Sequence, residues 1–327
     1  RGVPLFYGRG EGGRVCIHRI PFTSTFSDEL KAFVTIADAG SFTKASALLH
    51  RSQPAISRRI DMLERTLGAT LFKRHGHNPS MTAAGQALLP YAEAALAAVA
   101  DGQRAVQEIA ENTEARMTLA VVGTIADSYL VEVLRQFQTA HAPIRIDLQT
   151  ANSREVSDLV RRGESVVGLR YFPDPDPRLD SLPLGSERLY VVVPADHPVK
   201  ARRRQDMSAF VEDEWLSFPT SRAMPESYGS LLVRQLAAGG IADPRITTVD
   251  SLTAQKRLVE AGFGVALMPK RNVAEELARG TLRLVEIRSV EAQLPIVLLR
   301  RRGGPSSGSL DSFVAMLRHQ VPTLLDS

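Results

Sequence analysis

The sequence predicts an α+β protein built from a small N-terminal helical domain, one long helix and a larger C-terminal α/β domain. Apolar residues recur at helical spacing over residues 27–67 and at heptad spacing over residues 82–110. From residue 117 onward, strand-like and helix-like segments alternate. The predicted parts are an extension without regular structure (1–26), the helical domain (27–81), the long helix (82–112) and the α/β domain (115–327).

Composition excludes several classes of protein. A chain of 327 residues with 44% hydrophobic and 23% charged residues is typical of a globular protein of about two domains. Cys16 is the only cysteine, so an intrachain disulfide and a multi-cysteine metal site are excluded. No apolar run approaches the roughly 18 residues of a spanning helix, and residues 1–26 lack the apolar region of a signal peptide. We therefore expect a cytoplasmic protein with no membrane contact, metal or cofactor. The first methionine is Met62, and the sequence leaves open whether the chain starts at a processed, truncated, non-AUG or mis-assigned position.

Three short helices are predicted in the N-terminal domain. Helical periodicity begins at Ser27, a suitable N-cap, and ends at Gly40. A second helix covers residues 41–49 and, after a tight three-residue connection, a third helix lies between Ser52 as its N-cap and Gly68. The predicted inward faces are Leu30, Phe33, Val34 and Ala37; Phe42, Ala45, Leu48 and Leu49; and Ile56, Ile60, Leu63 and Leu67.

Two helices joined by such a turn form a helix-turn-helix, whose second helix can enter the major groove of DNA. Between residues 44 and 74, seven basic against two acidic side chains give a net charge of +5, whereas the whole chain carries +4. A solvated surface on an ordinary helical bundle is the alternative interpretation of charge alone. The excess of positive charge at the helix-turn-helix favours duplex DNA as a partner.

At these residues the sequence resembles the LysR-type transcriptional regulators. The resemblance is carried by ADAGSFTKAS at 37–46, SQPAIS at 52–57, LE at 63–64, LG at 67–68, LFKR at 71–74 and MTAAG at 81–85, where the family usually has Leu in place of Met81. It implies a winged helix-turn-helix, a homodimer or homotetramer, and RNA polymerase as a candidate partner. It also implies that base edges or adjacent phosphates are faced by Gln53, Pro54, Ser57 and Arg58, and that Arg74 lies in a hairpin wing near the minor groove. The predicted DNA-binding set further includes Ser52, Arg59 and Lys73.

The chemistry of these residues agrees with that role. Glutamine can bond adenine through two hydrogen bonds, arginine can bond guanine or phosphate, and a small serine allows close approach. Gln53 and Arg58 fall opposite the apolar stripe of the third helix, so neither is expected in the core.

Thr82 is predicted to cap the long helix, in which Pro90 should introduce a kink. A sustained heptad seam favours pairing with a second helix, whereas packing against the chain's own body is the alternative. The heptads by themselves support only pairing. The seam consists of Leu88, Ala92, Ala95, Val99, Gly102, Val106 and Ile109.

The C-terminal region should form two α/β subdomains with parallel sheets, in two lobes like those of a periplasmic solute-binding protein. We place the first subdomain at 115–188 and 296–327 and the second at 189–295. Predicted strands are 119–122, 144–148, 166–169, 190–193, 215–218, 246–249, 265–268 and 295–299, and predicted helices cover 130–137, 156–160, 231–236, 252–259 and a segment from 309.

Ligands of open α/β sheets bind beyond the carboxyl ends of strands, near helix N-termini. The loops at these positions hold Thr124, Asn152, Ser153, Thr220, Ser221, Arg222 and Ser251. Simple helix caps are the alternative interpretation of such residues. The resemblance, which includes GFGVALMP at 262–269, implies an inducer cleft here, although Val166 stands where the family often has Asp. Helix dipoles and Arg222 favour a small anion, and Phe218 and Phe263 leave room for an aromatic body.

Other functions have weaker support in the sequence. A freestanding solute-binding protein would share the two lobes, but the helix-turn-helix argues against it. A hydrolase using Ser306 would have only Asp311 and His319 as partners, both on one helix, so we expect no enzyme. The glycines at 8–13 lack a preceding strand, and His75 and His77 lack further metal ligands. The inducer, the regulated genes and the direction of control stay open.

Overall fold

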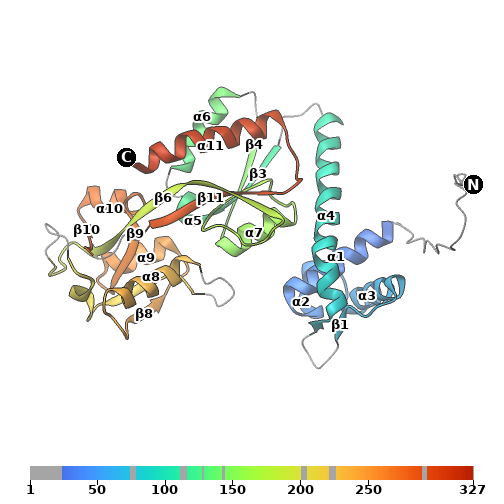
Figure 1. Ribbon diagram of the computed structural model, residues 1–327, viewed down its shortest axis with the longest axis horizontal. Helices are drawn as coiled ribbons and strands as arrows, with labels where there is room; N and C mark the ends of the chain where they lie inside the picture. The colour runs from blue at the N-terminus through green and yellow to red at the C-terminus, as the bar shows by residue number, and fades with distance from the viewer. Residues whose placement is uncertain are drawn as a thin grey trace, which may run out of the picture. The chain divides into compact units, whose positions relative to one another are not determined.

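The computed structural model divides the chain into two compact units, Arg1–Leu96 and Ala97–Ser327 (Figure 1). The N-terminal unit is helical, whereas the larger unit is built around a sheet. In the part of the chain that the structure describes, no helix is both long and apolar enough to cross a membrane. The described residues are 24–73, 79–110, 116–126, 129–141, 144–199, 205–220, 226–288 and 293–326.

The three predicted helices of the N-terminal unit are present. α1 (Ser24–Ala39) begins slightly before the expected residue, α2 covers Phe42–Leu48, and α3 covers Gln53–Leu67. Gly40 and Gly68 end α1 and α3 with positive φ values of 62° and 68°, a conformation that glycine adopts without strain. Strands β1 (Phe72–Lys73) and β2 (Ser80–Met81) pair antiparallel after α3.

Two details of these helices differ from the prediction. Leu48 is 64% exposed and does not belong to the core, whereas the buried residues of α2 are Ala45 and Ser46. The Ser46 hydroxyl donates to the Thr43 carbonyl oxygen over 2.8 Å, so a polar residue can be buried there. Ser52 lies at the N-cap position of α3, but its side chain makes no capping hydrogen bond.

The β1–β2 pair, which we call the wing, follows a segment that is held by hydrogen bonds from α3 and from the start of the next helix. The Glu64 carboxylate of α3 accepts from the backbone N–H groups of Leu71 and Phe72, over 2.6 and 3.2 Å. On the other side, the Thr82 hydroxyl donates to the Thr70 carbonyl oxygen over 2.7 Å. Thr82 also accepts from an N–H group in the first turn of the next helix, which confirms it as a cap.

The long helix α4 (Ala83–Ala110) continues through Pro90 without interruption. Its predicted seam divides into two parts. Leu88, Ala92 and Ala95 pack against the core of the N-terminal unit, which is the alternative that the sequence left open. Farther along, Val99 and Val106 are 42% and 65% exposed. Only the second part of the seam is therefore available for another chain.

The larger unit contains a nine-stranded sheet in the order β4-β3-β5-β11-β6-β9-β7-β8, with β10 beside β6. The predicted parallel sheets are only partly correct, because β6 and β11 run antiparallel to their neighbours. Only residues 172–178 join β5 to β6, which is too short for the crossover that a parallel pair needs. The strands are β3 (Arg116–Val122), β4 (Arg145–Ala151), β5 (Val167–Tyr171), β6 (Leu179–Pro194), β7 (Glu214–Ser217), β8 (Arg245–Thr248), β9 (Val265–Pro269), β10 (Leu282–Val285) and β11 (Gln293–Arg301).

β6 belongs to both halves of this sheet. Its first part, residues 179–188, pairs with β11, residues 189–192 pair with β9, and residues 191–194 pair with β10. Figure 1 shows β6 and β11 as the long strands that connect the two halves of this unit. The helices around the sheet are α5 (Gly123–Ala126), α6 (Leu130–Ala140), α7 (Ser153–Arg161), α8 (Tyr228–Ala238), α9 (Leu252–Glu260), α10 (Ala274–Arg279) and α11 (Gly308–Asp326), with 3₁₀ turns η1 (Met207–Phe210) and η2 (Lys270–Val273).

One carboxyl group lies on the buried face of β6. Glu187 is 4% exposed and alternates with the core residues Leu189 and Val191. Burial raises the pKa of Glu187 to about 7, although the Tyr171 hydroxyl at 3.1 Å and the charge of Arg271 act in the opposite direction. The carboxyl group is therefore partly protonated near neutral pH.

Gly85→Ala should destabilise the N-terminal unit. The added Cβ would lie 2.4 Å from the Leu71 carbonyl oxygen, so the backbone beside the wing would have to shift. We expect a loss of about 1–3 kcal/mol, measured by urea unfolding with far-UV circular dichroism. Gly308→Ala is the control, because a Cβ there meets nothing within 4 Å. Unchanged stability of Gly85→Ala would contradict the close contact.

Glu187 should make the α/β unit less stable as the pH rises from 4.5 to about 7. In this window the folded protein keeps a proton that the unfolded chain has released, so rising pH favours unfolding. The total loss is on the order of 3 kcal/mol, and Glu187→Gln should remove it. Fluorescence of Trp215, the single tryptophan and fully buried, follows unfolding of this unit. Identical pH profiles for parent and variant would contradict this assignment.

Candidate functional site

The exposed face of α3 carries the residues predicted to contact DNA. Gln53, Pro54 and Arg58 are exposed there, opposite the buried Ile56 and Ile60. The Gln53 side-chain oxygen accepts from the Thr43 hydroxyl over 3.4 Å, which leaves the amide nitrogen available to donate. This face can therefore offer hydrogen bonds from both an amide and a guanidinium group.

The other predicted DNA-binding residues differ in their surroundings. Ser52 and Lys73 are exposed and Ser57 is half-buried. Arg59 forms an ion pair with Asp28 of α1, with 2.9 Å between Nη1 and Oδ2, so its guanidinium already has a partner within the unit. Arg74 lies outside the described residues, as do Cys16, the glycines at 8–13, His75 and His77.

A cavity of about 540 Å³ lies beyond the carboxyl ends of β3, β4 and β7. Thr124, Asn152, Ser153 and Thr220 line it, as the sequence predicted. Ser251 is not among the lining residues, although its neighbours at 250 and 252 are. The predicted Ser221 and Arg222 lie outside the described residues.

Two of the predicted binding residues are helix caps. Asn152 accepts from the N–H groups of Arg154 and Glu155, and the Glu155 side chain completes a capping box. Ser251 accepts from the N–H group of Ala254 at the start of α9. These side chains therefore use helix N–H groups that the sequence analysis assigned to a ligand.

Several lining residues were not found from the sequence. Tyr171, Phe218 and Tyr228 form an aromatic wall, with ring centroids 5.8 Å apart for Tyr171–Tyr228 and 5.1 Å for Phe218–Tyr228. Of these three, only Phe218 was expected. Phe263 is 65% exposed and does not line the cavity. Arg154, at the start of α7, adds an exposed positive charge.

A chain of hydroxyl groups leads from the cavity into the core. Thr124 donates to the Tyr171 hydroxyl over 2.8 Å, and Tyr171 donates to the Glu187 carboxyl over 3.1 Å. The Asn272 amide nitrogen donates to the Thr124 carbonyl oxygen over 2.8 Å, which fixes the turn that carries Thr124. A glutamate in register with Leu189 on an alternating strand was the available sequence signal for this buried group.

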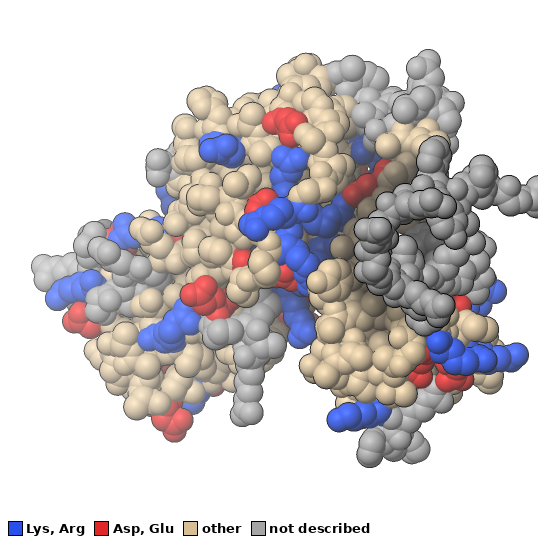
Figure 2. Space-filling model, turned by 45° about the vertical axis from the view of Figure 1, so that its right-hand side comes forward, with Lys and Arg blue, Asp and Glu red and all other residues tan. Residues whose placement is uncertain are grey.

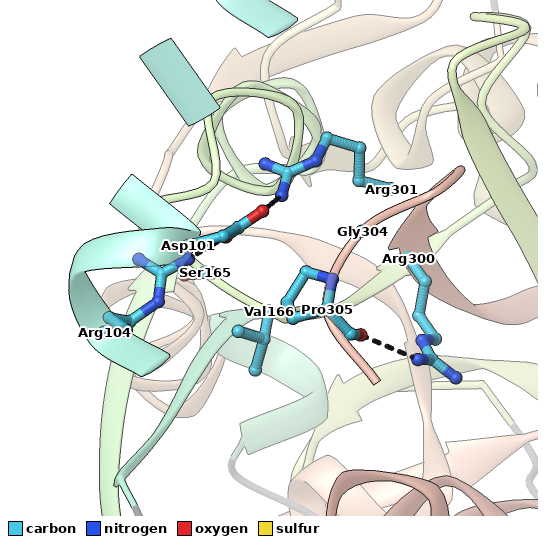
Figure 3. A pocket seen from close by; sticks show the side chains of 8 residues that line it. All are labelled: Asp101, Arg104, Ser165, Val166, Arg300, Arg301, Gly304 and Pro305. Carbon is cyan, nitrogen blue, oxygen red and sulfur yellow. Dashed lines mark hydrogen bonds and ion pairs between the residues drawn. The ribbon is translucent and has the colours of Figure 1, made fainter. Parts of the chain in front are cut away.

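A second concavity has a structural role (Figure 3). Its volume of about 10 Å³ is too small for a metabolite. Asp101 bonds both Arg104 and Arg301 there, and Val166 lies at its edge. Val166, which stands where the family often has Asp, therefore does not line the larger cavity.

Basic side chains also form a band on one face, with acidic side chains among them (Figure 2). In the larger unit, Arg161 pairs with Asp176 over 3.1 Å and Arg302 with Asp180 over 2.8 Å. Because the charges of these arginines are paired, they add no net positive charge that would attract the phosphate groups of DNA.

The structure gives no support to a Ser306 nucleophile. The Ser306 hydroxyl donates to Asp311 over 2.6 Å, and no described contact joins it to a histidine. The Ser306 hydrogen bond, with help from Arg300, lowers the pKa of Asp311, which makes this carboxylate a weaker base. Among the described residues, no group of three or more His, Cys, Asp and Glu side chains could hold a metal ion.

Comparison with known proteins gives matches along both units. Residues 27–86 match the family model for a bacterial regulatory helix-turn-helix protein of the lysR family, and residues 110–322 match the LysR substrate binding domain. The Hca operon transcriptional activator HcaR of Escherichia coli is 28% identical over 90% of this chain and 98% of its own length. The regulator YusT of Bacillus subtilis is 28% identical over 88% of this chain and 94% of its own.

Solved structures of LysR family regulators match most of this chain. CbnR, a LysR family transcriptional regulator, is 25% identical, covers 90% of this chain and 99% of its own, and has a TM-score of 0.58. CbnR in complex with its target DNA gives 26% identity, coverage of 89% and 98%, and a TM-score of 0.57. The chain therefore belongs to the LysR family of transcriptional regulators, with a DNA-binding helix-turn-helix domain and an effector-binding domain.

Proposed function

We propose that this regulator binds a specific DNA sequence through α3 and is controlled by a small anion bound in the cavity of its effector domain. The observation that carries the proposal is the cavity of about 540 Å³, which combines an aromatic wall with Thr124 and Arg154. Cavities of this size and composition hold metabolite-sized molecules. Its place of action would be the cytoplasm, where a bacterial regulator meets its DNA.

The cavity favours a carboxylate or phosphate attached to an apolar or aromatic body. Arg154 supplies positive charge at the N-terminal end of α7, where the helix dipole also favours an anion. Tyr171, Phe218 and Tyr228 offer ring faces to the rest of the molecule. Ser221 and Arg222 remain candidate contacts.

The DNA contacts divide by chemistry. Gln53 and Arg58 are proposed to bond base edges, while Ser52, Pro54 and Ser57 lie close enough on the same helix end to meet bases or phosphates. Lys73, with Arg74, would contact DNA from the wing near the minor groove. Because Arg59 is bonded to Asp28, we assign it to holding α3 against α1.

Pairing of two chains is proposed along the outer part of α4. Val99 and Val106 are large apolar residues exposed on this part of the helix, and exposed apolar surface of this kind favours association. Effector binding would change the spacing of the paired DNA-binding domains, with a coupling of about 1 to 3 kcal/mol. Assembly to a tetramer and contact with RNA polymerase remain proposals without assigned residues.

Arg58→Ala should reduce discrimination at one base pair or, if Arg58 meets a phosphate, lower the salt slope of binding by roughly one. Footprinting and titration on the intergenic region upstream of the gene, at about 0.1 M salt, would measure this. Arg135→Ala removes the same charge from the exposed surface of α6 and should leave DNA binding unchanged. Absence of any protected sequence with the parent protein would refute DNA binding by this surface.

Arg154→Met should weaken binding of an anionic effector about tenfold, because a hydrogen-bonded charge pair is lost. Candidate carboxylates and phosphates are first screened by thermal shift, and the affinity of each hit is then measured with both proteins. Arg135→Met, outside the cavity, is the charge-matched control. A hit that binds the Arg154→Met protein as tightly as the parent would remove Arg154 from the site.

Val99→Glu should weaken pairing, since two copies of α4 would bring like charges together in an apolar seam. Sedimentation velocity over a range of concentrations gives the oligomeric state. Val131→Glu is the matched control, because Val131 is also exposed but lies on α6. The seam is wrong if both variants associate as strongly as the parent.

A further inference from the structure

The hydroxyl chain beneath the effector cavity joins a ligand-facing group to a buried acid. Thr124 lines the cavity, whereas Glu187 at the other end is 4% exposed and does not line it. Tyr171 connects them through hydrogen bonds of 2.8 and 3.1 Å. No other residue stands between the two ends, so the protonation state of the acid can determine what the cavity presents.

The direction of this chain depends on the charge of Glu187. A carboxylate only accepts hydrogen bonds, so the Tyr171 proton must point to it and the Thr124 proton must point to Tyr171. Thr124 then offers only lone pairs to the cavity. A protonated Glu187 can donate instead, and both hydroxyl protons can reverse without movement of a heavy atom. Thr124 can then donate into the cavity.

The surroundings of Glu187 permit both forms. Tyr171 of β5 and Arg271 of η2 favour the ionised form, but burial opposes it and raises the pKa of Glu187 to about 7. Burial raises the pKa of Tyr129 before α6 and of Tyr228 of α8, and the nearby charge of Glu187 raises the pKa of both phenols further. In the described part of the chain, Glu187 Oε1 and the Tyr129 hydroxyl have no hydrogen-bond partner. The ionised carboxylate is thus incompletely satisfied.

We propose that Glu187 is a positioning residue of the effector site, which takes up a proton from solvent when an anionic effector binds and so makes Thr124 a hydrogen-bond donor to that anion. The inference rests on the proposed anionic effector and adds which kinds of ligand each protonation state of Glu187 prefers. A carboxylate or phosphate prefers the protonated chain, since it gains a donor and avoids a buried like charge. A neutral molecule that donates to Thr124 prefers the ionised chain.

The hydroxyl chain is tested first, in protein without any ligand. Infrared difference spectra of the full-length protein over a pH series should show a carboxylic C=O band with a midpoint near pH 7 that is absent in Glu187→Gln. Tyr171→Phe removes a hydrogen bond to the charged form and should raise the midpoint by about one pH unit. Tyr190→Phe is the control, because Tyr190 lies on the same strand as Glu187 but outside the hydroxyl chain, and it should not shift this midpoint. No Glu187-dependent band, or no shift with Tyr171→Phe, would overturn the proposal.

Proton uptake is then measured by calorimetry with benzoate, an aryl carboxylate, and with benzamide, its neutral analogue. From pH 6 to 8 the affinity of the parent for benzoate should fall about tenfold, with uptake of protons that buffers of different ionisation enthalpy reveal. Affinity for benzamide should not fall. Glu187→Gln should bind benzoate equally at both pH values, Thr124→Ser should retain the pH dependence, and Thr124→Val should lose it.

Different results would contradict the proposed anion site and the proposed role of Glu187. Benzoate binding to the parent without pH dependence or proton uptake would overturn the role of Glu187 while leaving the cavity as an anion site. No benzoate binding at either pH would count against an aromatic anion as effector, and the infrared shift with Tyr171→Phe would still decide whether Glu187 is coupled to the hydroxyl chain.

Discussion

The effector domain depends on β6, a strand that both halves of the sheet share. At residues 188 and 189 it changes its neighbour from β11 to β9, so the halves are joined by continuous backbone hydrogen bonding. Glu187 lies next to this change and is surrounded by Tyr171 from one half and Arg271 from the other. Any opening of the halves would admit water to the carboxyl group and remove the cause of its raised pKa. The geometry of the cavity and the charge of this acid are therefore linked.

This linkage gives the cavity two kinds of selectivity. Its aromatic wall contributes affinity without direction, because stacking and burial accept many ring shapes. The polar end is directional, since Thr124 can either donate or accept and the lining carries one positive charge at Arg154 and one negative charge at Asp250. A regulator built in this way can tolerate related ring systems and still reject a molecule with the wrong charge.

Much of the fold could be predicted because its signals are local. Helix stops at Gly40 and Gly68 and the cap at Thr82 depend on neighbouring residues, and the structure has them. Tyr171 and Glu187 lie close together because β5 and β6 pair with the two sides of β11, a strand more than 100 residues later. Spacing along the sequence therefore could not predict this contact. Leu48 differs from these cases: helical periodicity predicted it in the core, but the buried residues of α2 are Ala45 and Ser46.

The wing joint has a mechanical consequence. Glu64 of α3 accepts hydrogen bonds from the backbone of residues 71 and 72, and Thr82 donates one to residue 70. Gly85, at the start of α4, lies close to the carbonyl oxygen of Leu71. A joint fixed on both sides absorbs little bending, so a rotation of the helix-turn-helix is passed on to the first turns of α4. With 28 residues α4 is about 40 Å long. A tilt of about 5° would then move its far end by about 3.5 Å, which is comparable to the rise of one base pair. A rotation of the helix-turn-helix by only a few degrees is thus enough to displace the far end of α4 by about one base-pair step.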